Sequence, residues 1–270
     1  MKKELTKQEL SLSLGQINYL KTYRQHKLMI IFGRIFLFAA FLILWEGSVA
    51  LGLMDSFFFS SPTRILSLFW EMTKDSVIWG HIGITLWETC VSFLLVTLIS
   101  ILAAIGLIFF PRAAEILEPV LVMLNALPKS ALAPLIIVWL GTGMKTIIIA
   151  GMSVALFGSI INMYTGFSQV EEEKIKLIYT LGGTKKDTLT KVIFPFSIPV
   201  IISNMKVNIG LSLVGVIIGE FLAAKEGLGY LIIYGSQIFK LDLLILSILI
   251  LCLIAIVLYQ LIHLLEQKWG

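Results

Sequence analysis

Long apolar stretches free of charge constrain this 270-residue chain more than any other feature. Each is about 20 residues or longer, the length of helix that crosses roughly 30 Å of hydrocarbon. Charged residues make up 14% of the chain, against about 25% in soluble domains, and the mean hydropathy is +0.95. This composition excludes an ordinary water-soluble enzyme and a disordered chain.

The apolar stretches predict an all-α polytopic membrane protein with about six transmembrane helices. Single charged residues interrupt three of the stretches, namely Glu46 in the first, Lys129 in the third and Lys206 in the fifth. Pro128 and Pro134 are expected to break the third span, because proline removes a helix hydrogen bond. The six predicted spans are 35–54, 89–111, 119–140, 146–170, 192–219 and 243–265.

The positions of Lys and Arg predict the orientation of these spans. With the N-terminus in the cytoplasm, 14 of the 21 basic residues lie in cytoplasmic segments and five outside, and the other two lie within spans. This asymmetry follows the positive-inside rule. Both termini are therefore predicted to be cytoplasmic.

The same pattern divides the chain into three parts. We predict a cytoplasmic tail over 1–27, a transmembrane domain over 28–265 with a cytoplasmic loop at 168–194, and a cytoplasmic C-terminus over 266–270. The tail is too polar for a cleavable signal peptide. We expect it to be solvated, with an amphipathic interfacial helix as the alternative. After the first span, Ser61 and Pro62 predict the start of a short outer helix.

The cytoplasmic loop has the pattern of a helix, a glycine turn and a second helix. Acidic residues at 171–173 suit a helix N-terminus, Gly182 and Gly183 interrupt the apolar spacing, and Pro195 begins the next span. Loops of this length are usually functional or disordered. We favour a functional lever over a merely solvated loop, because the segment is patterned.

The sequence contains no pattern typical of catalysis or metal binding. It lacks the phosphate-binding motif G-x-x-x-x-G-K-[ST]. The two cysteines, Cys90 and Cys252, lie in apolar runs, and the three histidines are far apart. We therefore predict no catalytic residue, metal site or cofactor in this chain.

The fifth span carries polar groups on two faces. At about 100° per residue, Asn204, Asn208 and Ser212 share one face with Gly215 and Gly219. Polar groups at this depth are expensive in lipid, so we predict that this face lines a translocation path. The glycine pair is expected to permit close contact with another helix.

Three charged residues join this predicted path. Lys206 and Glu220 lie nearly opposite the asparagine face, and Lys129 follows the break at Pro128. The two lysines would raise the local positive potential and suit an anionic solute. The alternatives are a neighbouring partner for Lys206, bonds to freed carbonyls for Lys129, and solvation or capping at the outer end for Glu220.

The loop at 168–194 resembles the EAA loop of ABC-transporter permeases of the binding-protein-dependent import type (type I). Gly182 stands at the glycine position of the family's loop. Val192, Phe194 and Pro195 stand at its aliphatic, leucine and proline positions, with the same spacing. The Glu-Ala-Ala itself is replaced by Lys176, Leu177 and Ile178. The resemblance implies that these residues, with Gly183, form a coupling helix that docks on an ATPase.

Further motifs resemble the nitrate/sulfonate/taurine branch of that family. They keep the branch's order along roughly residues 40 to 265. They are Leu44-Trp45-Glu46, the Ser-Pro-Thr turn at 61–63, His81, Thr85-Leu86-Trp87-Glu88, the run 124–143, Gly219-Glu220, and Gly227-Leu228-Gly229-Tyr230.

The resemblance also implies the surroundings of the chain. It implies a homodimer in the bacterial cytoplasmic membrane with the path at its interface, cytoplasmic ATP-binding subunits that hold ATP and Mg, and an extracytoplasmic solute-binding protein. Lipid, and not nucleic acid, is the expected contact. The solute is expected to be a small anion of the nitrate, sulfonate or taurine type, or alternatively a vitamin precursor. A secondary ion-coupled transporter and a membrane scaffold are the other classes considered.

Overall fold

The computed structural model describes residues 14–269, and within this range all regular elements are helices. The predicted all-α class is confirmed. Five of the described helices are long and apolar enough to cross a membrane, and a sixth crossing requires that a bent helix pair count as one span. The chain forms two compact units, residues 1–64 and 65–270, and each is described by itself.

The first unit consists of helix α2 (Leu14–Ala50), the short helix α3 (Ser56–Phe59) and the start of α4 (Pro62–Lys74). Glu46 on α2 holds the first turn of α4, because its carboxylate accepts hydrogen bonds from the Thr63 amide at 3.0 Å and the Thr63 hydroxyl at 2.7 Å. The Ser61 hydroxyl accepts from the Arg64 amide at 3.4 Å. The predicted helix start at Ser61 and Pro62 is confirmed.

Helix α2 joins part of the predicted tail to the first span. The helix runs without a break from residue 14 through residue 27 into the apolar stretch, whose candidate span begins at Gln25. Residues 14–27 of the predicted tail are therefore helical. The prediction for residues 1–13 lies outside the described residues.

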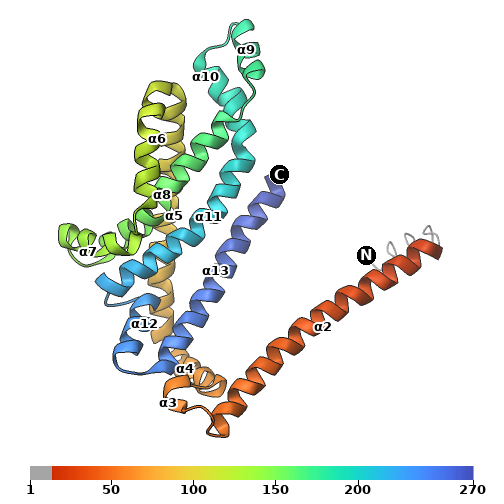
Figure 1. Ribbon diagram of the computed structural model, residues 1–270, viewed down its shortest axis with the longest axis vertical. Helices are drawn as coiled ribbons and strands as arrows, with labels where there is room; N and C mark the ends of the chain where they lie inside the picture. Colours follow the sequence, from red (N-terminus) through yellow and green to blue (C-terminus); the bar gives the residue numbers. More distant parts are fainter. Residues whose placement is uncertain (1–13, 270) are drawn as a thin grey trace. The chain divides into compact units, whose positions relative to one another are not determined.

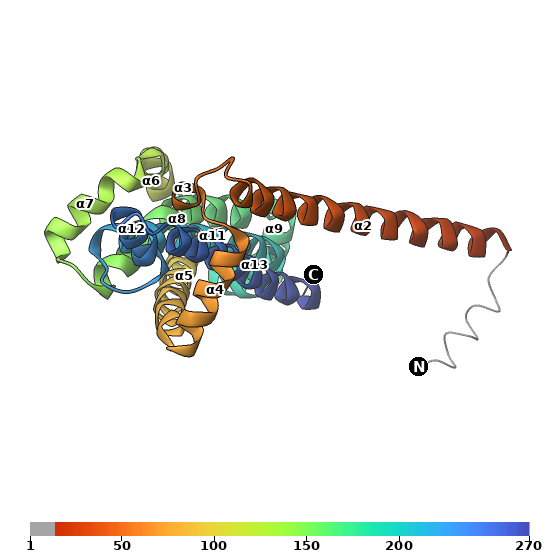
Figure 2. The same ribbon diagram turned by 90° about the horizontal axis from the view of Figure 1, so that it is seen from below.

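The second unit is a helical bundle (Figure 1). Helix α8 packs along both α5 and α11, and α11 also packs against α13 (Figure 1 and Figure 2). The short helix α12, which the sequence analysis did not predict, joins α11 to α13. The helices after α4 are α5 (Val77–Phe109), α6 (Pro111–Ala126), α7 (Lys129–Leu140), α8 (Met144–Ser168), α9 (Glu172–Thr180), α10 (Lys185–Thr188), the π-helix η1 (Leu189–Ile193), α11 (Phe194–Ala223), α12 (Leu228–Gln237) and α13 (Leu241–Trp269).

Small residues bring α8 and α11 close together. A Cβ atom added to Gly215 would lie 2.8 Å from the Gly151 Cα, and one added to Gly219 would lie 3.0 Å from the Ile147 Cα. No larger side chain fits at such separations, so the predicted helix contact at Gly215 and Gly219 is confirmed. The contact fixes α11 on α8 within one subunit.

The break predicted within the third span, 119–140, is confirmed at Pro128 but not at Pro134. Helices α6 and α7 meet at an angle of 95°, with the break at Leu127 and Pro128. Pro128 causes the break as predicted, because it cannot donate to a preceding carbonyl. Pro134, by contrast, lies inside α7 without ending it.

Candidate functional site: a coupling loop and polar residues of the membrane helices

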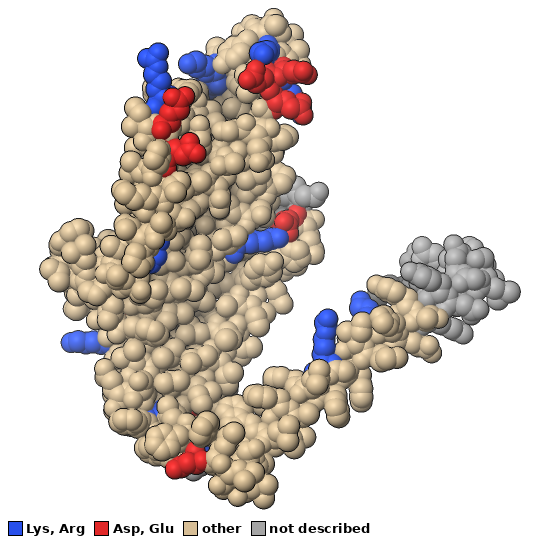
Figure 3. Space-filling view, in the orientation of Figure 1, with Lys and Arg blue, Asp and Glu red and all other residues tan. Residues whose placement is uncertain are grey.

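The predicted cytoplasmic loop forms a projection at one end of the second unit, made of α9 and α10 (Figure 1). Charged side chains gather at this end, above a surface of the helices with few charges (Figure 3). Helix α9 begins with Glu172 and Glu173 in its first turn, where the positive end of the helix dipole stabilises acidic side chains. Lys176 pairs with Glu172 at 2.9 Å, and the hydrogen bond that it donates lowers the pKa of Glu172.

The turn after α9 is a Schellman motif. The amide of Gly183 donates to the Ile178 carbonyl at 2.8 Å, and the amide of Gly182 donates to the Tyr179 carbonyl at 3.0 Å. Gly182 has φ +80°, a left-handed conformation that glycine adopts without steric cost. At Gly183 a side chain would collide with Ile178. Both glycines are therefore required, for different reasons.

The second half of the loop is stiff because a capped helix continues directly into the membrane span. The Thr184 hydroxyl accepts from the Asp187 amide at 3.3 Å, and the Asp187 carboxylate accepts from the Thr184 amide at 2.9 Å, which together form a capping box. Helix α10 then passes through η1 into α11 as one 39-residue segment, Lys185–Ala223. The π turn ends just before Pro195, whose missing N–H removes an α-helical bond.

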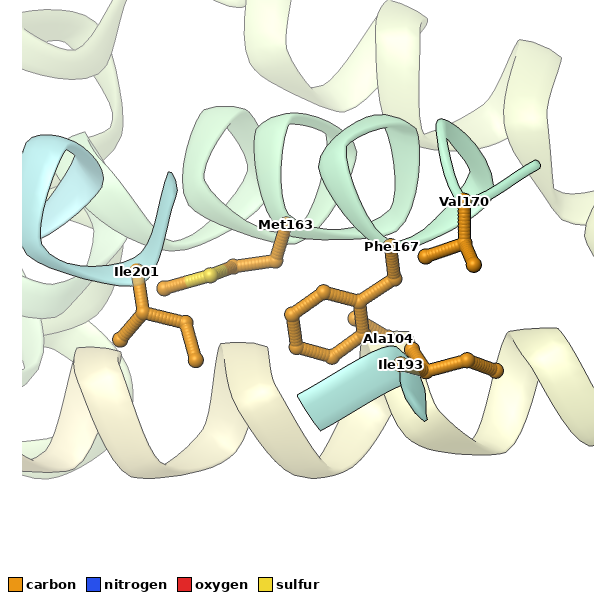
Figure 4. Packing of buried hydrophobic residues seen from close by; sticks show 6 residues of the cluster. All are labelled: Ala104, Met163, Phe167, Val170, Ile193 and Ile201. Carbon is orange, nitrogen blue, oxygen red and sulfur yellow. The ribbon is translucent and has the colours of Figure 1, made fainter. Parts of the chain in front are cut away.

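A buried apolar cluster anchors the loop to the bundle (Figure 4). Ile193 from η1 packs with Phe167 and Val170 from the end of α8 and with Ala104 from α5. Side chains on both halves of the loop add to the cluster from its edge: Ile175, Leu189 and Val192. The cluster thus joins both halves of the loop to α5 and α8.

Apolar side chains on the loop remain exposed. Leu177 on α9 is 57% exposed, and Leu181, the residue that caps the end of α9, is 76% exposed. Of the other predicted coupling residues, Lys176 and Phe194 are exposed, and Ile178 and Val192 are half-buried. An exposed apolar pair on a rigid, anchored projection has the form of a contact surface.

The predicted path face of α11 is mostly a packing face within one subunit. The Ser159 hydroxyl on α8 accepts from the Asn204 amide nitrogen at 2.9 Å and from the Asn208 amide nitrogen at 2.8 Å, and donates to Ser100 on α5 at 2.8 Å. Asn208 and Ser212 are fully enclosed. Within the chain their side chains are therefore buried, and their predicted place on a path between copies stays a prediction.

The two lysines have partners inside the chain. Lys206 forms an ion pair with Glu266 near the end of α13, and His263 contacts the same carboxylate at 3.0 Å. The Lys206 hydrogen bond, followed by that of His263, lowers the pKa of Glu266. Lys129 donates to the carbonyls of Leu124 at 2.7 Å and Asn125 at 3.0 Å. These contacts match the alternatives of a neighbouring partner and of bonds to freed carbonyls.

Glu220 is neither solvated nor on a surface path, because it lies buried at the end of α11 opposite the coupling loop. Its carboxylate accepts hydrogen bonds from the Thr85 hydroxyl at 2.6 Å and from the Gly229 amide. Glu88 on α5 is buried as well. We call this group the Glu220 latch, because it ties the loop before α12 to α5.

His81 completes the Glu220 latch by accepting from the Gly227 amide at 2.9 Å. His81, Thr85 and Glu88 stand in sequence motifs that do not predict their meeting with Glu220 and Gly227. The available signal was the presence of two acids in different apolar spans, since buried acids require partners.

Long apolar helices that can cross a membrane, together with a helical loop that projects from one end, are the form of a polytopic membrane subunit. The chain belongs to the family described as "Binding-protein-dependent transport system inner membrane component", whose sequence pattern matches residues 96–270. It is thus a permease of the ABC-transporter type, and the resemblance found in the loop is confirmed.

Individual relatives agree with this membership. The chain is 29% identical to a "Probable ABC transporter permease protein" of Haemophilus influenzae, over 81% of this chain and 88% of the relative. It is 29% identical to the riboflavin transport system permease protein RibX of Chloroflexus aurantiacus, over 84% of each chain. It is 24% identical to the taurine transport system permease protein TauC of Escherichia coli, over 82% of each.

A solved structure supports the fold. A chain of the MetNI methionine ABC transporter, in inward-facing conformations, superposes with a TM-score of 0.59 at 13% identity. The match covers 76% of this chain and 98% of that chain. At this identity the likeness establishes the shared helical fold alone.

Proposed function

We propose that this chain is the permease subunit of an ATP-driven import system and that the loop at 168–194 docks on a separate cytoplasmic ATP-binding subunit. The observation that carries the proposal is the exposed pair Leu177 and Leu181 on a helix anchored to the bundle core. A surface of this kind transmits a push only if the element behind it is stiff. The capping box, the Gly182 turn and the apolar cluster supply that stiffness.

The proposal includes an orientation and an assembly. The coupling loop and both termini face the cytoplasm of a bacterial cell, as the excess of basic residues on that side indicates. A second copy of the chain and an extracytoplasmic solute-binding protein complete the system. ATP and Mg belong to the ATP-binding subunits.

The solute is proposed to be a small polar molecule that the binding protein delivers. Sulfonates and taurine form one candidate class and vitamin precursors the other, since relatives of both kinds align over most of the chain. The two lysines that favoured an anion are engaged with Glu266 and with backbone carbonyls. Calorimetric titration of the co-purified binding protein with taurine, an alkanesulfonate, riboflavin and a formylaminopyrimidine distinguishes the classes.

A charge placed on the exposed pair tests the coupling role. Leu177→Asp is expected to abolish both co-purification of the ATP-binding subunit and solute-stimulated ATP hydrolysis, because a desolvated unpaired carboxylate opposes docking. Phe110→Asp is the matched control. Phe110 is 67% exposed and follows the end of α5 that packs on the same apolar cluster. Equal ATPase recovery from both variants would contradict the proposal.

A further inference from the structure

A cavity of about 450 Å³ lies at the end of α11 away from the coupling loop. Its walls come from α5, from the start of α8, from the last residues of α11 and from the loop that leads to α12. All these elements belong to one chain, so the cavity is formed within a single subunit. We call it the outer cavity, after the side of the membrane that it faces in the proposed orientation.

A buried acid with an unused oxygen lines the outer cavity. Glu88 on α5 is 1% exposed, and its Oε2 has no hydrogen-bond partner among residues 14–269. In Glu220, by contrast, Oε1 accepts from the Thr85 hydroxyl and Oε2 accepts from the Gly229 amide. A buried carboxylate oxygen that accepts no hydrogen bond costs free energy. A donor bound in the cavity would recover that cost.

Two helix ends give the outer cavity poles of opposite sign. Leu222 and Ala223, in the last turn of α11, lie in its wall, where unpaired carbonyls and the negative end of the helix dipole favour a cation. Gly143 and Met144 also lie in the wall, at the start of the 25-residue helix α8. The N-cap residue there is Gly143, which offers no side chain to the free amides, so this end favours an anion.

The other lining residues combine charge at the mouth with an apolar wall. Lys225 and Glu226, adjacent in the loop before α12, are exposed and present one charge of each sign. Ile84 is half-buried and Ile147 is 2% exposed, and both offer hydrocarbon to a ligand. The cavity therefore suits a small molecule that carries both charges on a short hydrocarbon link.

We propose that the outer cavity binds a small zwitterion, with its ammonium group on Glu88 and its anionic group at the start of α8. An ammonium group donates hydrogen bonds, and one to Glu88 Oε2 would pair the buried acid with a cation. A molecule with only one of the two charges leaves one pole of the cavity unmatched. The site is defined without reference to an ATP-binding subunit and goes beyond the proposed function.

Three probes with the same two-carbon link test the pairing of charges. Taurine carries both charges, ethylammonium only the cation and ethanesulfonate only the anion. Each is titrated calorimetrically into the full-length chain in lipid nanodiscs, with no binding protein added. We expect taurine to bind at least about tenfold more tightly than either single-charge probe, because each charged group adds a charge-assisted hydrogen bond. Equal affinities for the three probes, or no binding of taurine, would overturn the site.

Glu88→Gln tests the buried acid. The amide keeps the size of the side chain and removes its charge, so the affinity for taurine is expected to fall at least about tenfold. The affinity for ethanesulfonate is expected to stay the same. Glu118→Gln, at an exposed acid on α6 outside the cavity, is the control and should bind taurine like the wild type. Unchanged affinity of Glu88→Gln for taurine would contradict the assignment of the ammonium group to Glu88.

Cysteine protection tests the site without a change at Glu88. Thr142→Cys, in the cavity lining, is made in a parent in which Cys90 and Cys252 are replaced by serine. Saturating taurine is expected to slow maleimide labelling at least about threefold, because the bound molecule covers the thiol. Lys145→Cys, exposed on α8 outside the lining, is the control. Equal labelling of Thr142→Cys with and without taurine would overturn the site.

An uptake assay identifies the source of the ligand. In vesicles that hold the whole transporter, taurine uptake that falls in Glu88→Gln would identify the zwitterion as the transported solute. Taurine binding without uptake would identify it as a separate effector. Both results support the site, and neither depends on which subunit the coupling loop contacts.

Discussion

Two glycine turns flank the helical segment Lys185–Ala223, and they differ in what surrounds each glycine. At the coupling end, Gly182 has φ +80° and a side chain added there would meet nothing within 4 Å. At the other end, Gly227 has φ +106° and a side chain added there would lie 2.7 Å from the Glu220 carboxylate oxygen Oε2. The first glycine serves only a change of chain direction, whereas the second also makes room for a buried acid.

This difference separates a surface built for contact from one built for internal stability. The coupling turn is held by backbone bonds and by the Thr184 cap, and its outer face stays open. In the Glu220 latch the hydrogen bonds stay within the chain. Glu220 accepts from Thr85 and Gly229, and His81 accepts from the Gly227 amide. We therefore expect substitutions at the latch to destabilise the fold and substitutions at the coupling turn to impair coupling.

The largest expected effect is that of Gly227→Val. The valine would combine a left-handed backbone with overlap against the Glu220 carboxylate, and we expect a loss of about 3–5 kcal/mol of stability. Membrane yield and the thermal midpoint after detergent extraction measure it. Normal yield and an unchanged midpoint would show that the latch does not hold this end of α11.

Gly182→Val is expected to have a smaller effect on stability and a large effect on coupling. Open space surrounds the position, so the cost is the backbone strain alone, about 1–2 kcal/mol. Solute-stimulated ATP hydrolysis is expected to disappear while membrane yield is largely retained. Gly182→Asn is the matched control, because asparagine tolerates the left-handed region. Coupling by the valine variant equal to that of the asparagine variant would contradict the role of the turn.

Thr184→Ala tests the stiffness of the second half of the loop. Loss of the capping box is expected to cost about 1 kcal/mol and to reduce the coupling ratio of transport to hydrolysis without abolishing docking. Thr190→Ala is the comparison variant, since its hydroxyl bonds only to the Lys186 carbonyl of its own helix. The thermal midpoint of Thr184→Ala should be lower than that of Thr190→Ala. Identical midpoints would show that the capping box does not stabilise the loop.

The smallest expected effect is that of Glu172→Gln. The pKa of Glu172 is lowered in the folded protein by its bond from Lys176, so its stabilisation is present above the unfolded pKa and is lost as pH falls through the folded value. Because the pair is exposed, the effect is screened and small. The difference in thermal midpoint between wild type and variant should be greatest near neutral pH and vanish in acid. A larger difference in acid would reverse this assignment.

The parts of this picture that the sequence predicted depend on local chemistry. Gly182, Pro128 and the Ser61–Pro62 helix start are positions where a residue's own backbone limits decide the conformation. The close approach at Gly215 also follows from residue size. Each of these predictions is confirmed.

The parts that the sequence did not predict depend on which helix covers which face. Helical periodicity groups Asn204, Asn208 and Ser212 correctly, but it does not reveal that Ser159 on α8 lies opposite them. The 95° angle between α6 and α7 could not be predicted from the sequence either, because a proline sets the position of a helix break and not its angle.

The most direct test of the coupling account is site-specific photo-crosslinking from position 181. A photoreactive amino acid at Leu181, in the intact transporter in native membranes, is predicted to form adducts with an ATP-binding subunit. The same probe at Val214, an exposed position on the half of α11 away from the loop, is predicted to form none with that subunit. Adducts from position 181 that contain only lipid, or none at all, would contradict the claim that this loop docks on the ATPase.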